Sequence, residues 1–340
     1  MDAKPNREKQ EIKSNSAMKN YEPELSNLPG IQILHDSLKN VINVDAQIEM
    51  LAEGFMWSEG PIWVEEYQML LFSDVPANIV YKWSEKEGLK EYLNPSGYTG
   101  DGKVGEEALK EKGANGLLLT MDGKLILPQH GDRRVAMMDA PLDAPESKFI
   151  TIADHYMGKK FNSPNDIVYH KNGDLYFTDP PYGLTDGFDD SPRKELDFNG
   201  VYKIDKNGIV TLLDKELTRP NGIAFSPDFK KLYVANSDPK KAIWMVYDVD
   251  ENGELSNGSV FFDATFMVGE KHKGLPDGLK VDDHGNLFAT GPGGILIFSA
   301  DGHHLGTINT GKATANCGFN NDKTVLYITA HDQLMRLKIK

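Results

Sequence analysis

One phrase recurs six times along this 340-residue chain and constrains its fold more than any other feature. The phrase is a polar corner, a short apolar run, a tight turn and a second run rich in strand-forming residues. Its clearest copy is Asn162–Gly183 (NSPNDIVYHKNGDLYFTDPPYG), in which Asn-Gly between two such runs indicates a hairpin. The six copies begin at Glu59, Asn115, Asn165, Asn221, Asp277 and Ala315.

The spacing of the copies predicts the architecture. They begin 38 to 56 residues apart, and further strand-like pieces lie between them, such as Gly200–Ile204, Ile243–Asp248 and Ile295–Phe298. Each period therefore holds about four short strands, which is the content of a propeller blade. We predict an all-β fold, a six-bladed β-propeller with four-stranded blades, in preference to two packed β-sandwiches.

The two ends of the chain complete this prediction. The last copy is short after Thr329, so a strand from the N-terminal region has to close the ring, and Ile31–Leu34 and Val41–Val44 are the candidates. Residues 1–30 are polar and are predicted to be a disordered lead-in to a propeller domain over residues 31–340. That lead-in lacks the apolar run of a signal peptide. The compartment stays open: cytoplasmic as the sequence stands, periplasmic or secreted if a signal peptide has been removed.

Insertions between the copies predict loops at the ends of the propeller, where lids and selectivity elements tend to lie. The candidates are Tyr98–Gly113, with a helical turn over Glu106–Lys112, the acidic segment Leu184–Asn199, and Phe266–Gly274.

Composition excludes several classes of protein. With 51 acidic and 37 basic residues the net charge is −14, which argues against nucleic-acid binding and suits a cation or a neutral small molecule. Cys317 is the single cysteine, so there is no disulfide framework and no cysteine-based metal site. No apolar run of about 18 residues is present, so no membrane span is predicted. We expect a monomer or a weak homo-oligomer.

The corner residues suggest a binding site. Inner strands of all blades run in the same direction, so the residues that begin them gather at one mouth of the channel. Their side chains are oxygen donors, which hard cations such as Ca²⁺ prefer. The alternative is that Asn-Gly and Asp-Gly are ordinary turn dipeptides. Each copy already has its own hairpin turn further on, which favours the metal ring: Glu59, Asn115, Asn165, Asn221 and Asp277.

Several of these motifs carry a family resemblance. The chain resembles the gluconolactonase/senescence-marker-protein (regucalcin-like) family over residues 48–339, through Ser58–Trp63 (SEGPIW), Asn162–Asp166 (NSPND), Arg219–Asp228 (RPNGIAFSPD) and Leu275–Asp282 (LPDGLKVD). Phe177–Gly183 (FTDPPYG) is similar to the bacterial gluconolactonase branch. The resemblance implies a six-bladed propeller with one divalent cation in the channel, Ca²⁺ in the first place, with Mg²⁺, Mn²⁺ and Zn²⁺ as further options.

The resemblance also implies roles for residues. Glu59, Asn221 and Asp277 would be metal ligands, Asn165 a further ligand or a substrate contact, and Asp277 the general base or nucleophile. The implied activity is that of a carboxylic ester hydrolase, a metal-dependent lactonase that opens sugar lactones such as glucono-1,5-lactone to the aldonic acid. One departure concerns substrate recognition: Ser163 stands where some animal members have a substrate-contacting Arg.

The chemistry leaves alternatives open. Asp277 could take the proton of an attacking water or attack directly, and a water activated by the metal would make either role unnecessary. Other lactones or phosphotriesters could be the substrate. A non-catalytic propeller with a structural Ca²⁺ is the alternative from a different class, since a fold alone does not imply a function.

Further residues are weaker candidates. His130, Tyr182 and Asn115 are candidate substrate contacts; His272 and His331 are more distant ones. Asp248–Ser259 begins like a calcium-binding EF-hand loop but has Ser where that loop needs a bidentate Glu, so a surface hairpin is predicted. Gly291–Gly294 is predicted to be a turn, Cys317 is predicted to be an inert buried residue, and no Gly-x-Ser-x-Gly motif indicates a serine hydrolase.

Overall fold

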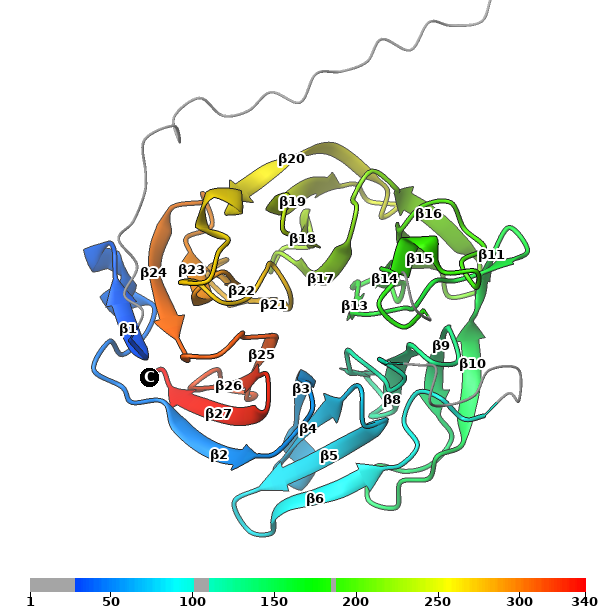
Figure 1. Ribbon diagram of the computed structural model, residues 1–340, viewed down its shortest axis with the longest axis horizontal. Coiled ribbons are helices and arrows are strands. Elements are labelled where there is room, and N and C mark those ends of the chain that lie inside the picture. Colours follow the sequence, from blue (N-terminus) through cyan, green and yellow to red (C-terminus); the bar gives the residue numbers. More distant parts are fainter. Residues whose placement is uncertain (1–27, 101–109, 185–187) are drawn as a thin grey trace, which may run out of the picture.

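The chain folds as a six-bladed β-propeller in the computed structural model, which describes residues 28–100, 110–184 and 188–340. Figure 1 shows the six sheets arranged around a common centre, with β3, β13, β17, β21 and β25 nearest to it. This confirms the predicted fold class. The predicted lead-in over residues 1–30 and the helical turn predicted over Glu106–Lys112 fall largely outside the described residues. No helix in the described ranges is long and apolar enough to span a membrane.

Each blade is an antiparallel sheet built on four strands, which follow one another along the chain in the first five blades. Blade one has β3 (Ser58–Val64), β4 (Met69–Asp74), β5 (Ile79–Ser84) and β6 (Gly88–Leu93). Blade two has β7 (Leu118–Leu119), β8 (Leu125–Gln129), β9 (Arg134–Met138) and β10 (Phe149–Ala153). Blade three has β13 (Ile167–Tyr169), β14 (Leu175–Asp179), β15 (Gly200–Ile204) and β16 (Val210–Asp214).

The second half of the ring repeats the pattern. Blade four has β17 (Pro220–Phe225), β18 (Lys231–Asp238), β19 (Lys241–Val249) and β20 (Leu255–Asp263). Blade five has β21 (Leu279–Val281), β22 (Leu287–Gly291), β23 (Gly294–Phe298) and β24 (His304–Asn309). Blade six has β25 (Asn316–Phe319), β26 (Val325–Ala330) and β27 (Gln333–Lys338) and takes its outer strand from elsewhere.

The remaining elements are small. A two-stranded hairpin, β11 (His155–Tyr156) and β12 (Lys159–Lys160), follows blade two. In the described part of the chain the helical segments are short 3-10 turns: η2 (Asp36–Asn40), η3 (Glu65–Tyr67), η5 (Phe188–Asp190) and η6 (Thr265–Met267).

The N-terminal region closes the ring as predicted, but with a different strand. β2 (Glu49–Glu53) pairs with β27 and becomes the outer strand of blade six. The predicted strand Ile31–Leu34 largely coincides with β1 (Gly30–Ile33), which instead adds a fifth strand to blade five by pairing with β24. Residues 41–44 form a turn after η2. The prediction missed β2 because an outer strand is half exposed, and its sequence EMLAE carries little apolar signal.

Aromatic side chains fill the spaces between blades. Trp244 of blade four is fully buried and packs against Phe262 and against Phe298 of blade five, with ring centroids 6.2 and 5.7 Å away. Gly291 lies under the Trp244 indole, where an added Cβ would come within 2.7 Å of the ring. Such contacts between neighbouring sheets hold the inner strands in a fixed ring, and that ring positions the site.

Candidate active site

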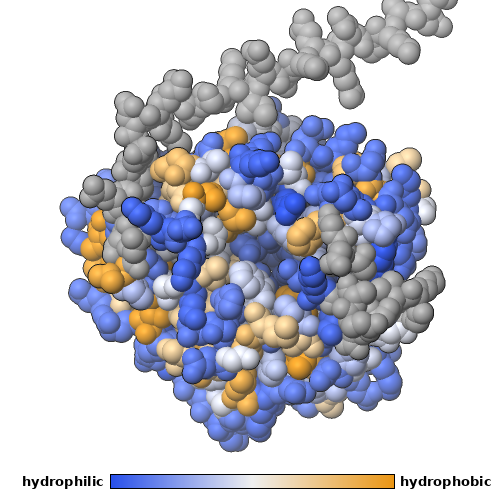
Figure 2. Space-filling model, in the orientation of Figure 1, coloured by the Kyte–Doolittle hydropathy of each residue, from blue (hydrophilic) through white to orange (hydrophobic). Residues whose placement is uncertain are grey.

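The five corner residues, which lie within three residues of the start of the first five inner strands, meet at one cavity. Its volume is about 570 Å³, and Figure 2 shows this face of the molecule hollowed near its centre, where the sheets meet. The five predicted ring residues all line the cavity: Glu59, Asn115, Asn165, Asn221 and Asp277. Register shifts in blades one and four fall beside Glu59 and Asn221, and such bulges re-aim side chains near functional sites. The structure thus brings these side chains together, while their chemical roles stay predictions.

The glycine that follows four of the five corner residues explains why the corners can approach one another. A Cβ added to Gly60 would lie 2.3 Å from the Asn115 carbonyl oxygen, and one added to Gly222 would lie 2.2 Å from the Asp277 carbonyl oxygen. Gly278 leaves the same kind of space for the Asn316 side chain, at 2.0 Å. These glycines therefore serve close packing of inner strands at the axis rather than hairpin turns.

Blade three departs from this glycine pattern. Asp166 occupies the position that Gly60, Gly116, Gly222 and Gly278 occupy in other blades, so it adds a buried carboxylate below the ring. Its Oδ1 accepts a hydrogen bond from the Ile167 amide at 2.9 Å, while its Oδ2 has no hydrogen-bond partner.

Burial raises the pKa values of the carboxylates at the site. It raises the pKa of Glu59 to about 7, against the opposing effect of hydrogen bonds from Asn316, Gly60 and Trp57. Burial also raises the pKa of Glu111 to about 7. The pKa of Asp277 is raised well above its usual value, first by burial and then by the negative charges of Glu59, Glu111 and Asp166. Removing the charge repulsion requires either protons or a bound cation.

Two ring residues keep oxygen atoms that nothing in the protein satisfies. Asn165 Oδ1 and Asp277 Oδ1 are buried and have no hydrogen-bond partner. Buried polar atoms nearly always have a hydrogen-bond partner, so these two oxygens indicate a place where a ligand binds. The donor set is entirely oxygen, which fits a hard cation.

A cation here would rely on amides as well as carboxylates. Among the described residues, no three His, Cys, Asp or Glu side chains are grouped closely enough to hold a metal by themselves. The predicted ligands are two carboxylates, Glu59 and Asp277, and two amide oxygens, on Asn165 and Asn221, beside the cavity. This mixed set fits Ca²⁺ better than it fits a transition metal.

Several residues of the site escaped the sequence prediction. Asn316 begins β25 and donates a hydrogen bond to Glu59 Oε2 at 3.2 Å, which makes it the sixth member of the ring. Trp57 donates to Glu59 Oε1 at 3.3 Å and lines the cavity. Glu111 also lines the cavity, from the segment before blade two. The repeat could have identified Asn316, because it is the second residue of the sixth copy, directly after Ala315.

The histidine candidates lie at different depths. His130 is fully buried behind Asn165, with its Nε2 3.4 Å from Asn165 Nδ2 and its Nδ1 3.6 Å from Glu111 Oε2. It is not among the side chains that line the cavity. His272 does line the cavity, and its Nδ1 lies 3.2 Å from the Met267 carbonyl oxygen. His331 is half exposed and meets the Trp57 ring edge-on.

A wall of the cavity comes from the segment after β14. Tyr182 lines the cavity, and its hydroxyl lies 3.4 Å from the Ser237 carbonyl oxygen. Arg219 lines the same wall, with its guanidinium 5.9 Å from the Tyr182 ring centroid and 3.6 Å from Asp189. Ser163, which replaces the substrate-contacting Arg of some animal members, is fully buried and faces the backbone of Pro180 instead.

The other sequence features have structural explanations. Residues 250–254 form the hairpin turn between β19 and β20, in which Asp250 Oδ1 accepts hydrogen bonds from the amides of Asn252 and Glu254 at 2.8 and 2.9 Å. Its oxygens are used within the turn, as expected for a surface hairpin. Cys317 is fully buried, and burial raises the pKa of its thiol to about 12.

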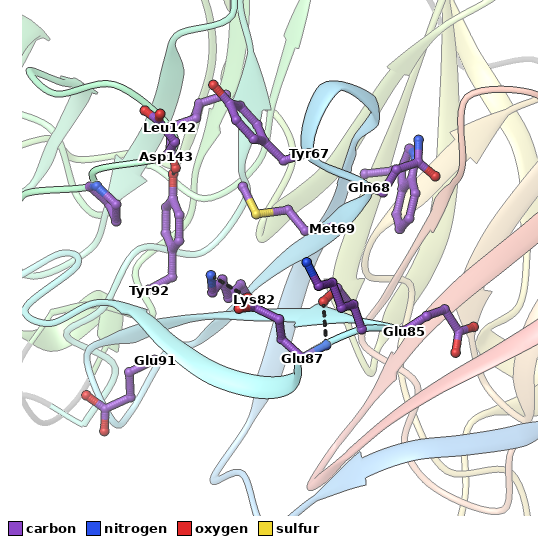
Figure 3. A pocket seen from close by; sticks show the side chains of 14 residues that line it. Tyr67, Gln68, Met69, Lys82, Glu85, Glu87, Glu91, Tyr92, Leu142 and Asp143 are labelled. Carbon is purple, nitrogen blue, oxygen red and sulfur yellow. Dashed lines mark hydrogen bonds and ion pairs between the residues drawn. The ribbon is translucent and has the colours of Figure 1, made fainter.

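A second cavity, of about 520 Å³, lies on the outside between blades one and two. Figure 3 shows its lining, which includes Tyr67, Met69 and Tyr92. Two of its charged groups, Lys82 and Glu87, form an ion pair at 3.0 Å. No unpartnered buried oxygen of the described residues belongs to this lining, so the channel mouth is the better candidate site.

Comparisons with known proteins agree with this fold. The profile of the SMP-30/Gluconolactonase/LRE-like region matches residues 57–332. The gluconolactonase of Zymomonas mobilis is 41% identical over 312 residues, which cover 89% of this chain and 84% of that protein. A solved gluconolactonase from Xanthomonas campestris superposes with a TM-score of 0.77 at 28% identity and covers 92% of this chain and 97% of its own.

A more distant structure shares the fold. The regucalcin of Agrobacterium tumefaciens, described as a calcium-binding protein, has a TM-score of 0.66 at 20% identity and covers 86% of this chain and 94% of its own. The family profile spans most of the propeller, from Trp57 beside Glu59 to Asp332 after β26. The chain therefore belongs to the SMP-30/gluconolactonase/LRE-like family.

Proposed function

We propose that the cavity at the channel mouth opens sugar lactones such as glucono-1,5-lactone to the aldonic acid, with a divalent cation bound in the ring. The observation that carries this proposal is the pair of unpartnered oxygens on Asn165 and Asp277 beside a third ring oxygen donor, Glu59. Family membership supports the general reaction, hydrolysis of a cyclic carboxylic ester, because the relative that is 41% identical is named gluconolactonase.

The residues that would hold the cation are Glu59, Asn165, Asn221 and Asp277. Ca²⁺ is the expected ion because the ligands are all oxygens, and the structural relative described as calcium-binding supports this choice. When bound, such a cation supplies a Lewis acid that stabilises negative charge on the carbonyl oxygen of the lactone. It would also offset the mutual repulsion that raises the pKa of Asp277.

Side chains of the cavity would transfer the proton and orient the substrate. Asp277 lines the cavity with a free Oδ1, which is the atom expected to take a proton from the attacking water. The water oxygen forms a bond to the carbonyl carbon, the ring C–O bond breaks, and the proton passes to the departing ring oxygen. Asn115 and Tyr182 lie on the walls and are expected to hydrogen-bond the hydroxyls of the sugar ring.

The test is acid release from glucono-1,5-lactone in the presence of Ca²⁺, corrected for the spontaneous opening of this lactone. We expect turnover by the wild-type protein and a loss of about 100-fold or more in Asp277→Asn. The control is Asp283→Asn, which changes an exposed carboxylate of the same blade and should leave turnover unchanged. An Asp277→Asn protein that folds and keeps full turnover would remove Asp277 from the proposal.

A further inference from the structure

We propose that His130 is a positioning residue: its ring nitrogen Nε2 holds the side-chain amide of Asn165 so that Asn165 Oδ1 is presented to the cation. The inference rests on the proposed function, in which Asn165 is a ligand. It concerns the orientation of an amide, since an Asn turned the other way would offer an NH₂ group, which cannot bind a cation.

The position of His130 is fixed from several sides. It follows β8 and is fully buried, and its backbone amide donates to the Gly113 carbonyl oxygen at 3.1 Å. Gly183 packs against it so closely that an added Cβ would lie 2.6 Å from the His130 Cβ and 2.7 Å from the Ser163 Cβ. The imidazole therefore has little room to move.

The carboxylate of Glu111 favours one tautomer of this ring. Its Oε2 lies 3.6 Å from His130 Nδ1, which has no hydrogen-bond partner; the distance is too long for a good hydrogen bond, but a negative charge there favours a proton on that nitrogen. In a neutral imidazole one ring nitrogen carries the proton and the other can accept a hydrogen bond. A proton on Nδ1 leaves a lone pair on Nε2 as an acceptor.

The lone pair on Nε2 then decides how Asn165 is turned. Asn165 Nδ2 lies 3.4 Å from His130 Nε2, where an N–H can be accepted but an amide oxygen would be repelled. With its nitrogen engaged, Asn165 has Oδ1 left over, and this oxygen is buried and has no protein partner. Glu111, His130 and Asn165 thus form a chain that ends in one oriented oxygen.

Hydrogen bonds within Asn162–Gly183 also help to hold Asn165 and His130 in place. Asp179 accepts hydrogen bonds from the backbone amides of Asn162 and Ser163 at 2.8 and 2.7 Å. Ser163 Oγ donates to the Pro180 carbonyl oxygen at 2.5 Å and accepts from the Gly183 amide at 2.9 Å. These bonds join the segment that carries Asn165 to the segment that presses on His130. Ser163 therefore acts here in support of the ring, in place of a contact with substrate.

The test is a double-mutant cycle read out by calorimetric titration with Ca²⁺. In His130→Leu the acceptor for the Asn165 amide is lost, and we expect the dissociation constant for Ca²⁺ to rise about 10- to 100-fold, as for other partners of metal ligands. Asn165→Asp presents oxygen in either orientation. Adding His130→Leu to Asn165→Asp should therefore change the dissociation constant by no more than about twofold.

The matched control is His170→Leu. His170 is also buried and lies just beyond the opposite end of β13 from Asn165, so this change costs packing without touching the amide. We expect a lower melting temperature and an unchanged Ca²⁺ affinity. If His130→Leu behaves like this control, or weakens Ca²⁺ binding equally in both Asn165 backgrounds, the inference is wrong. A wild-type protein that binds no divalent cation would overturn the metal proposal and this inference together.

Discussion

Because Glu59 is buried, we expect its charge to lower the stability of the metal-free protein while the same carboxylate serves in metal binding. Its side chain is 2% exposed, and the rise of its pKa from 4.5 to about 7 means that the folded chain disfavours the ionised carboxylate. Below pH 4.5 both folded and unfolded forms hold the proton, and the cost is absent. It grows as the pH rises from 4.5 to 7 and is complete above 7, where it amounts to about 3 kcal/mol.

Glu59→Gln removes that charge while keeping the shape of the side chain. The amide cannot accept every hydrogen bond that Glu59 receives from Trp57, Gly60 and Asn316, and one lost bond costs about 1 kcal/mol. The metal-free variant should therefore be more stable than the metal-free wild type by about 2 kcal/mol at pH 8. Near pH 5 the two proteins should be almost equally stable.

Calcium should shift this balance toward the wild type. At a concentration 100 times its dissociation constant, Ca²⁺ stabilises the wild type by about 2.7 kcal/mol, whereas Glu59→Gln has lost a carboxylate ligand and gains less. The assay is urea unfolding at pH 5 and pH 8, with chelator and with Ca²⁺, and with Glu251→Gln as an exposed control. A Glu59→Gln protein that is less stable than wild type in chelator at pH 8, or whose difference from wild type does not change with pH, would refute this reasoning.

Three further predictions concern the scaffold. Gly222→Ala places a Cβ 2.2 Å from the Asp277 carbonyl oxygen, so we expect a loss of at least about 1–3 kcal/mol in urea unfolding; a neutral result would contradict close packing at the axis. Trp244→Ala should cost about 3–5 kcal/mol, measured in the same way, because it empties the contact between blades four and five. Cys317 should react with a thiol reagent only at the rate of unfolding, because it is fully buried and its pKa is raised to about 12; fast labelling of the folded protein would contradict its placement.

The sequence was most informative about the inner strands. Their copies repeat because each inner strand faces the same environment at the axis, so corner, glycine and apolar run recur together. The position of Asn165 and Asp277 at one cavity follows from that repetition. The Asn-Gly and Asp-Gly pairs were ambiguous in sequence, since turns and close-packed strands both use glycine; the contacts of Gly222 and Gly278 resolve the ambiguity.

Features that depend on contacts between distant segments could not be predicted. β2 closes the ring although its residues carry a weak strand signal, because pairing with β27 rather than local propensity forms it. Glu111 reaches the site because the backbone after it pairs with residues 129–131, which no local pattern records. His130 was predicted to contact substrate, and its burial behind Asn165 depends on the packing of Gly183 and Ser163.

The most direct test of the central claim is lactone opening measured before and after removal of divalent cations. Acid release from glucono-1,5-lactone would be followed with wild-type protein as prepared, after chelation, and after Ca²⁺ is restored, with the spontaneous rate subtracted. We expect chelation to abolish turnover and Ca²⁺ to restore it, because the oxygens of Asn165 and Asp277 then have their partner. Full turnover in chelator, by protein shown to hold no metal, would contradict the account.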